Sequence, residues 1–134
     1  MRREPPLPTE AELRLLRVLW QRGPSTVREA LSALPGVEET GYTTALKLLQ
    51  IMHAKGLVTR DESNRTHVYA AAVPPESTQR RMVADLVDRA FGGSAHQLVM
   101  QALSPQLSSP EELARIRALI RSLDSDAAPT EEEG

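Results

Sequence analysis

Residues 41–49 decide the fold, and they read Gly41-Tyr42-Thr43-Thr44-Ala45-Leu46-Lys47-Leu48-Leu49. An i, i+3, i+4, i+7 spacing gives this segment one apolar stripe, formed by Ala45, Leu48, Leu49 and Met52. Such a stripe indicates a helix with one buried face. We predict that this helix begins next to Gly41 and ends at Lys55-Gly56.

The flanking segments predict the rest of a winged helix-turn-helix. Residues 25–31 indicate a shorter helix, which Pro35-Gly36-Val37 ends. Residues 57–60 and 65–69 indicate two strands joined by the polar turn 61–64. Two helices at a sharp angle followed by a β-ribbon fit a DNA major groove with a wing beside it.

The exposed N-terminal half of the 41–56 helix supplies the candidate groove-reading residues. Thr43, Lys47 and Gln50 point away from the apolar stripe, and Thr44 and Leu46 lie at its flanks. The candidates are the hydroxyl, aromatic and cationic side chains Tyr42, Thr43, Thr44 and Lys47. Such groups can bind base edges or phosphates, and a threonine methyl can pack on a thymine methyl. The alternative is an ordinary solvated helix start, where threonine is also common. The helix-helix-hairpin context favours DNA contact.

Two arginines make the predicted wing a candidate phosphate-binding element. Arg60 and Arg65 flank the polar turn, where they can meet the DNA backbone. Asp61 and Glu62 at the tip would repel phosphates. We therefore expect contact by the strand arginines rather than deep insertion of the wing.

An N-terminal helix is predicted to complete the DNA-binding domain, which we place at residues 1–74. Thr9 and Glu12 have the spacing of a capping box, and Gly23-Pro24 stops the helix after about Arg22. Its inward positions are Leu13, Leu16, Leu19 and Trp20. Residues 1–8 are expected to form a flexible arm.

After Pro74-Pro75 the pattern changes to three short helices, predicted at about 76–91, 94–103 and 110–123. Helices this short cannot bury their apolar faces alone, so we expect a second copy of the chain to cover them. Packing against the N-terminal domain is the rival explanation. The expected interface residues are Val83, Leu86, Val87, Leu98, Val99, Ile116, Leu119, Ile120 and Leu123. Residues 75–123 are thus a predicted dimerisation domain, and residues 124–134 a disordered acidic tail.

Composition restricts the possible functions of this 134-residue chain. The net charge of −2 is the sum of a weakly basic N-terminal part and an acidic C-terminal part. DNA binding by the weakly basic part should therefore be modest and depend on salt. With no cysteine, no signal peptide and no apolar run long enough to span a membrane, a cytoplasmic location is expected.

We expect no catalytic site, no metal and no cofactor. The sequence contains no glycine-rich phosphate loop, nucleophile elbow or zinc-protease motif. His53, His67 and His96 lie on different predicted elements, which argues against a shared metal. The pair Glu38-Glu39 would lie near the DNA, and it counts against DNA binding.

Several motifs resemble the penicillinase-repressor family across about residues 7–123. The matching segments are residues 7–12, 18–20, 27–31, 42–49, 55–58 and 65–69. The resemblance implies a homodimeric repressor, with an N-terminal winged helix and a C-terminal helical dimerisation domain, that binds a palindromic operator. It also implies groove reading by Tyr42, Thr43, Thr44 and Lys47, and a phosphate contact by Arg65.

The resemblance leaves the inducing signal open. β-Lactam-responsive members are cleaved at an Asn-Phe bond after a membrane sensor protease signals, and the matching pair here is Gln101-Ala102. Copper-responsive members need a cysteine-rich motif, and this chain has no cysteine. Two other functions stay possible: a winged-helix protein-interaction module that does not bind DNA, and a regulator with a ligand pocket between its domains.

Overall fold

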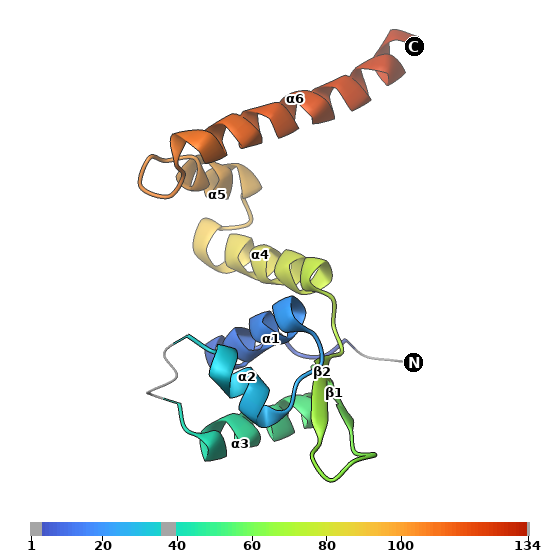
Figure 1. The fold of residues 1–134 in the computed structure, drawn as a ribbon. Helices are drawn as coiled ribbons and strands as arrows, with labels where there is room; N and C mark the ends of the chain where they lie inside the picture. The colour runs from blue at the N-terminus through green and yellow to red at the C-terminus, as the bar shows by residue number, and fades with distance from the viewer. Residues whose placement is uncertain (1–3, 36–39, 134) are drawn as a thin grey trace. The chain divides into compact units, whose positions relative to one another are not determined.

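The computed structural model describes residues 4–35 and 40–133, with side chains as far as Asp126. The chain divides into two compact units, one reaching Val83 and one beginning at Ala84. The first unit holds three helices and a hairpin, and the second holds most of the C-terminal helices. In chain order the elements are α1 Glu10–Arg22, α2 Val27–Ala33, α3 Tyr42–Lys55, β1 Val58–Asp61, β2 Val68–Ala71, α4 Pro75–Phe91, α5 Ala95–Ala102 and α6 Pro110–Glu133 (Figure 1).

Helix α1 begins and ends where the sequence predicted. The Thr9 hydroxyl accepts from the Glu12 amide, the Glu12 carboxylate accepts from the Thr9 amide, and the chain turns away at Gly23 with φ 91°. The buried face is broader than predicted, because Leu15 and Val18 lie in the core beside Leu16 and Leu19. Leu13 and Trp20 are only half-buried.

The loop between α1 and α2 serves both the helix and the hairpin. Thr26, rather than Ser25, caps α2, and it forms a second capping box with Glu29. Ser25 instead exchanges two backbone hydrogen bonds with Tyr69, each of 2.8 Å. This bridge attaches the hairpin to the helical core.

The hairpin differs from the prediction in its second strand. Strands β1 and β2 are antiparallel, with Val58 opposite Ala71 and Arg60 opposite Tyr69. Strand β2 begins at Val68 and not at Arg65, so the loop is longer than the predicted four-residue turn. Tyr69 explains this register: it is buried and pairs with β1 on one side and Ser25 on the other.

The core of the first unit unites α1, α2, α3 and the hairpin. Thirteen hydrophobic side chains are buried there, from Leu15 in α1 to Tyr69 in β2. Trp20 adds a polar tie, because its indole N–H donates to the Val73 carbonyl at 2.9 Å. The architecture is therefore the predicted one, a mainly helical winged helix-turn-helix with a small β-hairpin.

The start of α4 and the N-terminal arm both belong to the first unit. Arg81 donates to the Pro5 carbonyl at 2.8 Å and forms an ion pair with Glu4 at 3.4 Å. Residues 4 and 5 therefore contact α4, whereas we predicted a flexible arm over residues 1–8. The two units meet within α4, after Val83, and not at Pro74-Pro75 where the sequence placed the domain boundary.

The second unit has the predicted helices with a longer final one. Gly92 and Gly93 separate α4 from α5, both with positive φ, and Ser94 and Ser109 cap α5 and α6. Helix α6 continues to Glu133, past the predicted end near residue 123 and through the expected disordered tail. Residues 111–126 contain neither glycine nor proline, which favours continuation of the helix past residue 123.

Candidate nucleic-acid interface

The N-terminal half of α3 presents the predicted groove-reading residues together. Tyr42, Thr43, Thr44 and Lys47 are all exposed, while Ala45, Leu49 and Met52 have no exposed surface. The helical period places Thr43 and Lys47 opposite this buried stripe and Thr44 at its flank, while Tyr42 is exposed because it is the first residue of the helix. The result is a protruding face with two threonine hydroxyls, a phenol and an ammonium group.

A hollow of about 300 Å³ lies between this helix and the hairpin. Tyr42, Leu46 and Gln50 line it from α3, and Val27 lines it from α2. The hairpin side is richer in polar and cationic groups, which are Arg60, Arg65, Thr66, His67 and Tyr69. Helix, hollow and wing therefore form one continuous surface with hydrogen-bond donors on both sides.

The sequence analysis did not identify Arg28, which contacts the first residue of α3. The guanidinium of Arg28, in the first turn of α2, lies over the Tyr42 ring at 5.1 Å from its centroid. This is a cation–π contact between the two helices of the motif. Arg28 and Lys47 give the α2–α3 part of the surface two exposed cations.

Arg60 lies in β1, as predicted, but its guanidinium already has a partner. Its Nε donates to Glu62 Oε2 at 2.6 Å. The Tyr69 side chain and the Glu62 carboxylate together raise the pKa of Arg60 above its ordinary value. Glu62 was expected at the wing tip as a repulsive charge, and it is instead engaged with Arg60.

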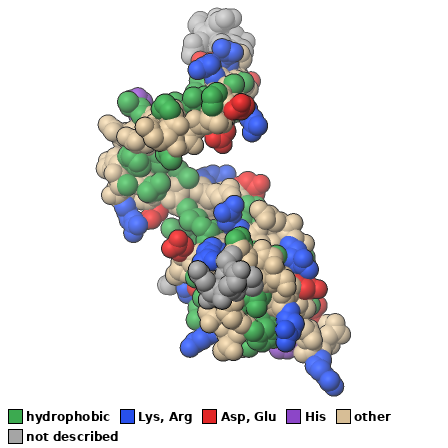
Figure 2. Space-filling view, turned by 60° about the vertical axis from the view of Figure 1, so that its left-hand side comes forward, with side chains coloured by type: hydrophobic (Ala, Val, Ile, Leu, Met, Phe, Trp, Pro, Cys, Tyr) green, Lys and Arg blue, Asp and Glu red, His purple; other side chains and the backbone are tan. Residues whose placement is uncertain are grey.

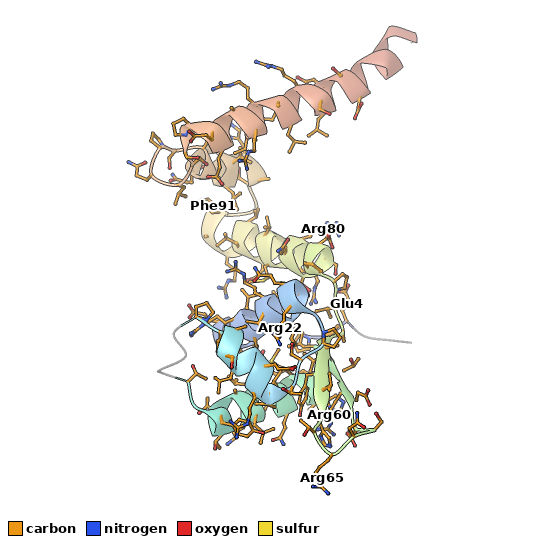
Figure 3. The ribbon with its side chains drawn as sticks, viewed as in Figure 1. Glu4, Arg22, Arg60, Arg65, Arg80 and Phe91 are labelled. Carbon is orange, nitrogen blue, oxygen red and sulfur yellow. The ribbon has the colours of Figure 1, made fainter. Side chains whose placement is uncertain are left out.

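Arg65 differs from the prediction in its position. It lies in the loop before β2 and not in a strand, and it is exposed. Figure 3 shows its side chain extending away from the tip of the hairpin. A loop position gives Arg65 more reach than a strand position would.

Asp61 stabilises the wing turn. Its Oδ1 accepts from the Ser63 hydroxyl at 2.7 Å and from the Ser63 amide at 2.9 Å. These two hydrogen bonds lower the pKa of Asp61 below its ordinary value. The predicted acidic pair Glu38-Glu39 lies outside the described residues.

The expected interface residues of the C-terminal helices fall into two groups. Val87, Leu98 and Ile116 are half-buried. The other six are exposed by two-fifths or more, namely Val83, Leu86, Val99, Leu119, Ile120 and Leu123. Met100 and Leu107, which the prediction omitted, are also exposed. Figure 2 shows hydrophobic side chains gathered on the C-terminal helices.

Three further predictions concern the Gln101-Ala102 pair, metal binding and membrane spans. Gln101-Ala102 ends α5, and the Ala102 carbonyl accepts from the Ser108 hydroxyl. In the part of the chain that the structure describes, no three His, Asp or Glu side chains gather in a way that could hold a metal ion. None of the helices within that part is long and apolar enough to cross a membrane.

Comparisons with known proteins agree with this arrangement. The family model described as "Penicillinase repressor" matches residues 8–122. The chain is 28% identical over 102 residues to "Transcriptional regulator BlaI" of Mycobacterium tuberculosis, in both strain CDC 1551 / Oshkosh and strain ATCC 25618 / H37Rv. Each alignment covers 75% of this chain and 74% of the relative.

Two solved structures are also similar. The solution structure of the DNA binding domain of the repressor BlaI has a TM-score of 0.48 and 20% identity, and the match covers 55% of this chain and 90% of that one. The crystal structure of transcriptional regulator Tm0710 from Thermotoga maritima has a TM-score of 0.48 and 16% identity, with 91% and 77% coverage. The family model, by contrast, includes α3, the hairpin and most of the C-terminal helices. The chain therefore belongs to the penicillinase repressor family of winged-helix, DNA-binding transcriptional repressors.

Proposed function

We propose that this protein represses transcription as a homodimer that occupies a palindromic operator. The observation that carries the proposal is the exposed polar face of α3 beside a wing with two arginines. An α-helix of this width fits the major groove, and the wing then lies against the adjacent backbone. We infer no enzymatic activity.

Base reading is assigned to Thr43, Thr44 and Lys47, with Tyr42 at the edge of the contact. The threonine hydroxyls can bind base edges and their methyl groups can pack on thymine, while Lys47 can donate to guanine. These side chains are exposed and take no part in the buried core of the first unit. Substitutions of these side chains should therefore leave the fold intact.

Phosphate contacts are assigned to three arginines, Arg28 in α2 and Arg60 and Arg65 in the hairpin. Arg28 lies over the Tyr42 ring at the start of α3, and Arg60 and Arg65 line the hollow between α3 and the hairpin. Such contacts fix the register of a protein on DNA without reading sequence. Because the chain has a net charge of −2, these local cations must supply the attraction.

Dimerisation is assigned to the C-terminal helices. No apolar side chain of the second unit is fully buried among its described residues. Five of the expected interface residues in this unit are exposed, and so is Val83 at the end of the first unit. A second copy would cover these faces and set the distance between two reading helices. Two-fold operators of this kind place their half-sites one helical turn apart, roughly 10 bp, or a multiple of it.

A sensor protease could relieve repression by cutting the chain at Gln101-Ala102, the pair that matches the family's cleavage site. Gln101 lies in the last turn of α5 and the Ala102 carbonyl is hydrogen-bonded to Ser108. Cleavage at this bond would require that turn to unfold locally. Neighbouring genes would test the idea, because a membrane protease encoded beside this one would support it.

A mobility-shift experiment tests the proposed function. The full chain is titrated onto a palindromic fragment from its own promoter and onto a scrambled fragment of equal length and composition. We expect a complex with the palindrome at much lower protein concentration. Equal binding to both fragments would remove sequence-specific repression, and no binding would favour a protein-interaction module.

A further inference from the structure

The wing contains an ion pair that bears directly on how the protein contacts DNA. Arg60 Nε and Glu62 Oε2 are 2.6 Å apart, the shortest ion pair within the described residues. Arg60 is one of the residues lining the hollow between α3 and the wing. Its side chain is 24% exposed, and that of Glu62 is 50% exposed, so solvent and ligands can reach the pair.

A carboxylate on an arginine N–H occupies the position that a phosphate oxygen would take. Both anions accept charge-assisted hydrogen bonds from the same edge of the guanidinium. Arg60 is thus held in an orientation suited to an anion, with Glu62 as the anion present. A DNA phosphate that binds the Nε edge must displace this carboxylate.

The neighbouring acid does not share this role. Asp61 directs its Oδ1 at the amide and hydroxyl of Ser63, and these hydrogen bonds close the turn. The two acids of the wing therefore differ in function although they are adjacent in sequence and carry the same charge. Only Glu62 competes with phosphate for Arg60.

We propose that Glu62 is an affinity-limiting residue, a carboxylate that competes with DNA phosphate for Arg60. The inference rests on the proposed function, because it assumes that the wing contacts DNA. Exposed ion pairs are weak, so displacement is possible and its effect on affinity is modest. Phosphates are the same in every sequence, so Glu62 weakens operator and non-specific complexes alike. The repressor then depends more on the base contacts of α3.

The test compares Glu62→Gln with the unaltered full chain on the promoter palindrome and on scrambled DNA. We expect Glu62→Gln to bind both fragments roughly two- to fivefold more tightly. The slope of log affinity against log salt should steepen by up to about one unit, since Arg60 becomes available for one phosphate. Asp61→Asn is the matched control: it removes the same charge and keeps an oxygen for Ser63, and its effect should be smaller.

A double-variant cycle separates competition at Arg60 from simple repulsion. In an Arg60→Gln background, Glu62→Gln should tighten binding no more than Asp61→Asn does. The inference is overturned if Glu62→Gln tightens binding no more than Asp61→Asn does, or if its full gain persists in the Arg60→Gln background. If the unaltered chain binds neither fragment, the proposed function itself fails, which is a different outcome from loss of the Glu62 effect alone.

Discussion

The guanidinium of Arg28 lies over the ring of Tyr42, 5.1 Å from its centroid, and this contact joins α2 to the first residue of α3. The N-cap of α3 is Gly41, which offers no side-chain hydrogen bond to the helix start. The cation–π contact therefore helps to hold Tyr42 at the beginning of the reading helix. Contacts of this kind at exposed sites contribute about 0.5–1 kcal/mol.

Replacing Arg28 with alanine should weaken operator binding several-fold. The change removes a cation beside the reading helix and releases the Tyr42 ring. Tyr42→Phe serves as the control, because it keeps an aromatic ring beneath Arg28. Fluorescence anisotropy on a labelled operator would measure both affinities. A larger loss from Tyr42→Phe than from Arg28→Ala would show that the phenol hydroxyl, and not the stacked arginine, matters.

Salt dependence should report the number of phosphate contacts made by the wing. Arg65→Ala is expected to reduce the slope of log affinity against log salt by about one unit, because one phosphate loses its counterpart. Arg17→Ala, an equal charge change on the exposed side of α1, should leave the slope unchanged. Titrations at several salt concentrations measure this. A complex insensitive to salt would argue against backbone contacts.

Stability in acid should depend on Glu12. Burial of its carboxylate opposes ionisation, but Lys55 Nζ at 2.7 Å and the Thr9 amide at 2.9 Å outweigh this, and the pKa of Glu12 falls below its ordinary 4.5. The folded protein therefore binds this proton more weakly than the unfolded chain. The resulting stabilisation is present above pH 4.5 and is lost as the pH falls through the lowered pKa.

The variant Glu12→Gln isolates this contribution. It should lower the free energy of unfolding at neutral pH by about 1.5–3 kcal/mol, the range for hydrogen bonds to a charged group. The difference between the two proteins should shrink at low pH, where Glu12 is protonated. Urea unfolding at neutral and acidic pH measures both values. A difference that is constant with pH would contradict the ionised pair.

Charges placed on α6 should separate the dimer without unfolding the winged helix. Leu119 and Leu123 are both 59% exposed, so Leu119→Asp with Leu123→Asp disturbs no buried core in the chain itself. We expect a monomer whose operator affinity is lower by about two orders of magnitude or more, because the second half-site loses its high effective concentration. Sedimentation of the parent and the variant tests this. A parent protein that is monomeric at micromolar concentration and still binds tightly would disprove the dimer.

Local signals in the sequence predicted most of the winged helix. The capping box at Thr9 and Glu12, the stop at Gly23 and the apolar stripe ending at Met52 each depend on residues within one helix. Such periodic and capping patterns act over a few residues, so they can be identified without the fold. The exposed face of α3 followed directly from the position of its buried stripe.

Contacts between distant segments were not predictable in the same way. The start of β2 depends on the Ser25–Tyr69 bridge, which joins two segments that are far apart in the chain. The Lys55–Glu12 pair and the Arg28–Tyr42 stack also join different helices, and helical spacing within one segment does not reveal them. Glu62 appeared as a repulsive tip charge because its pairing with Arg60 depends on the conformation of the turn.

The most direct test of the account is the effect of Thr43→Ala with Lys47→Ala on discrimination between the promoter palindrome and scrambled DNA. Both side chains are exposed on the reading face of α3, so the fold should remain intact by circular dichroism. Each lost base contact should cost on the order of 1–3 kcal/mol on the palindrome, while binding to scrambled DNA falls much less. We expect the double variant to lose most of its preference for the palindrome over scrambled DNA. A folded double variant that keeps the full preference would contradict DNA reading by α3.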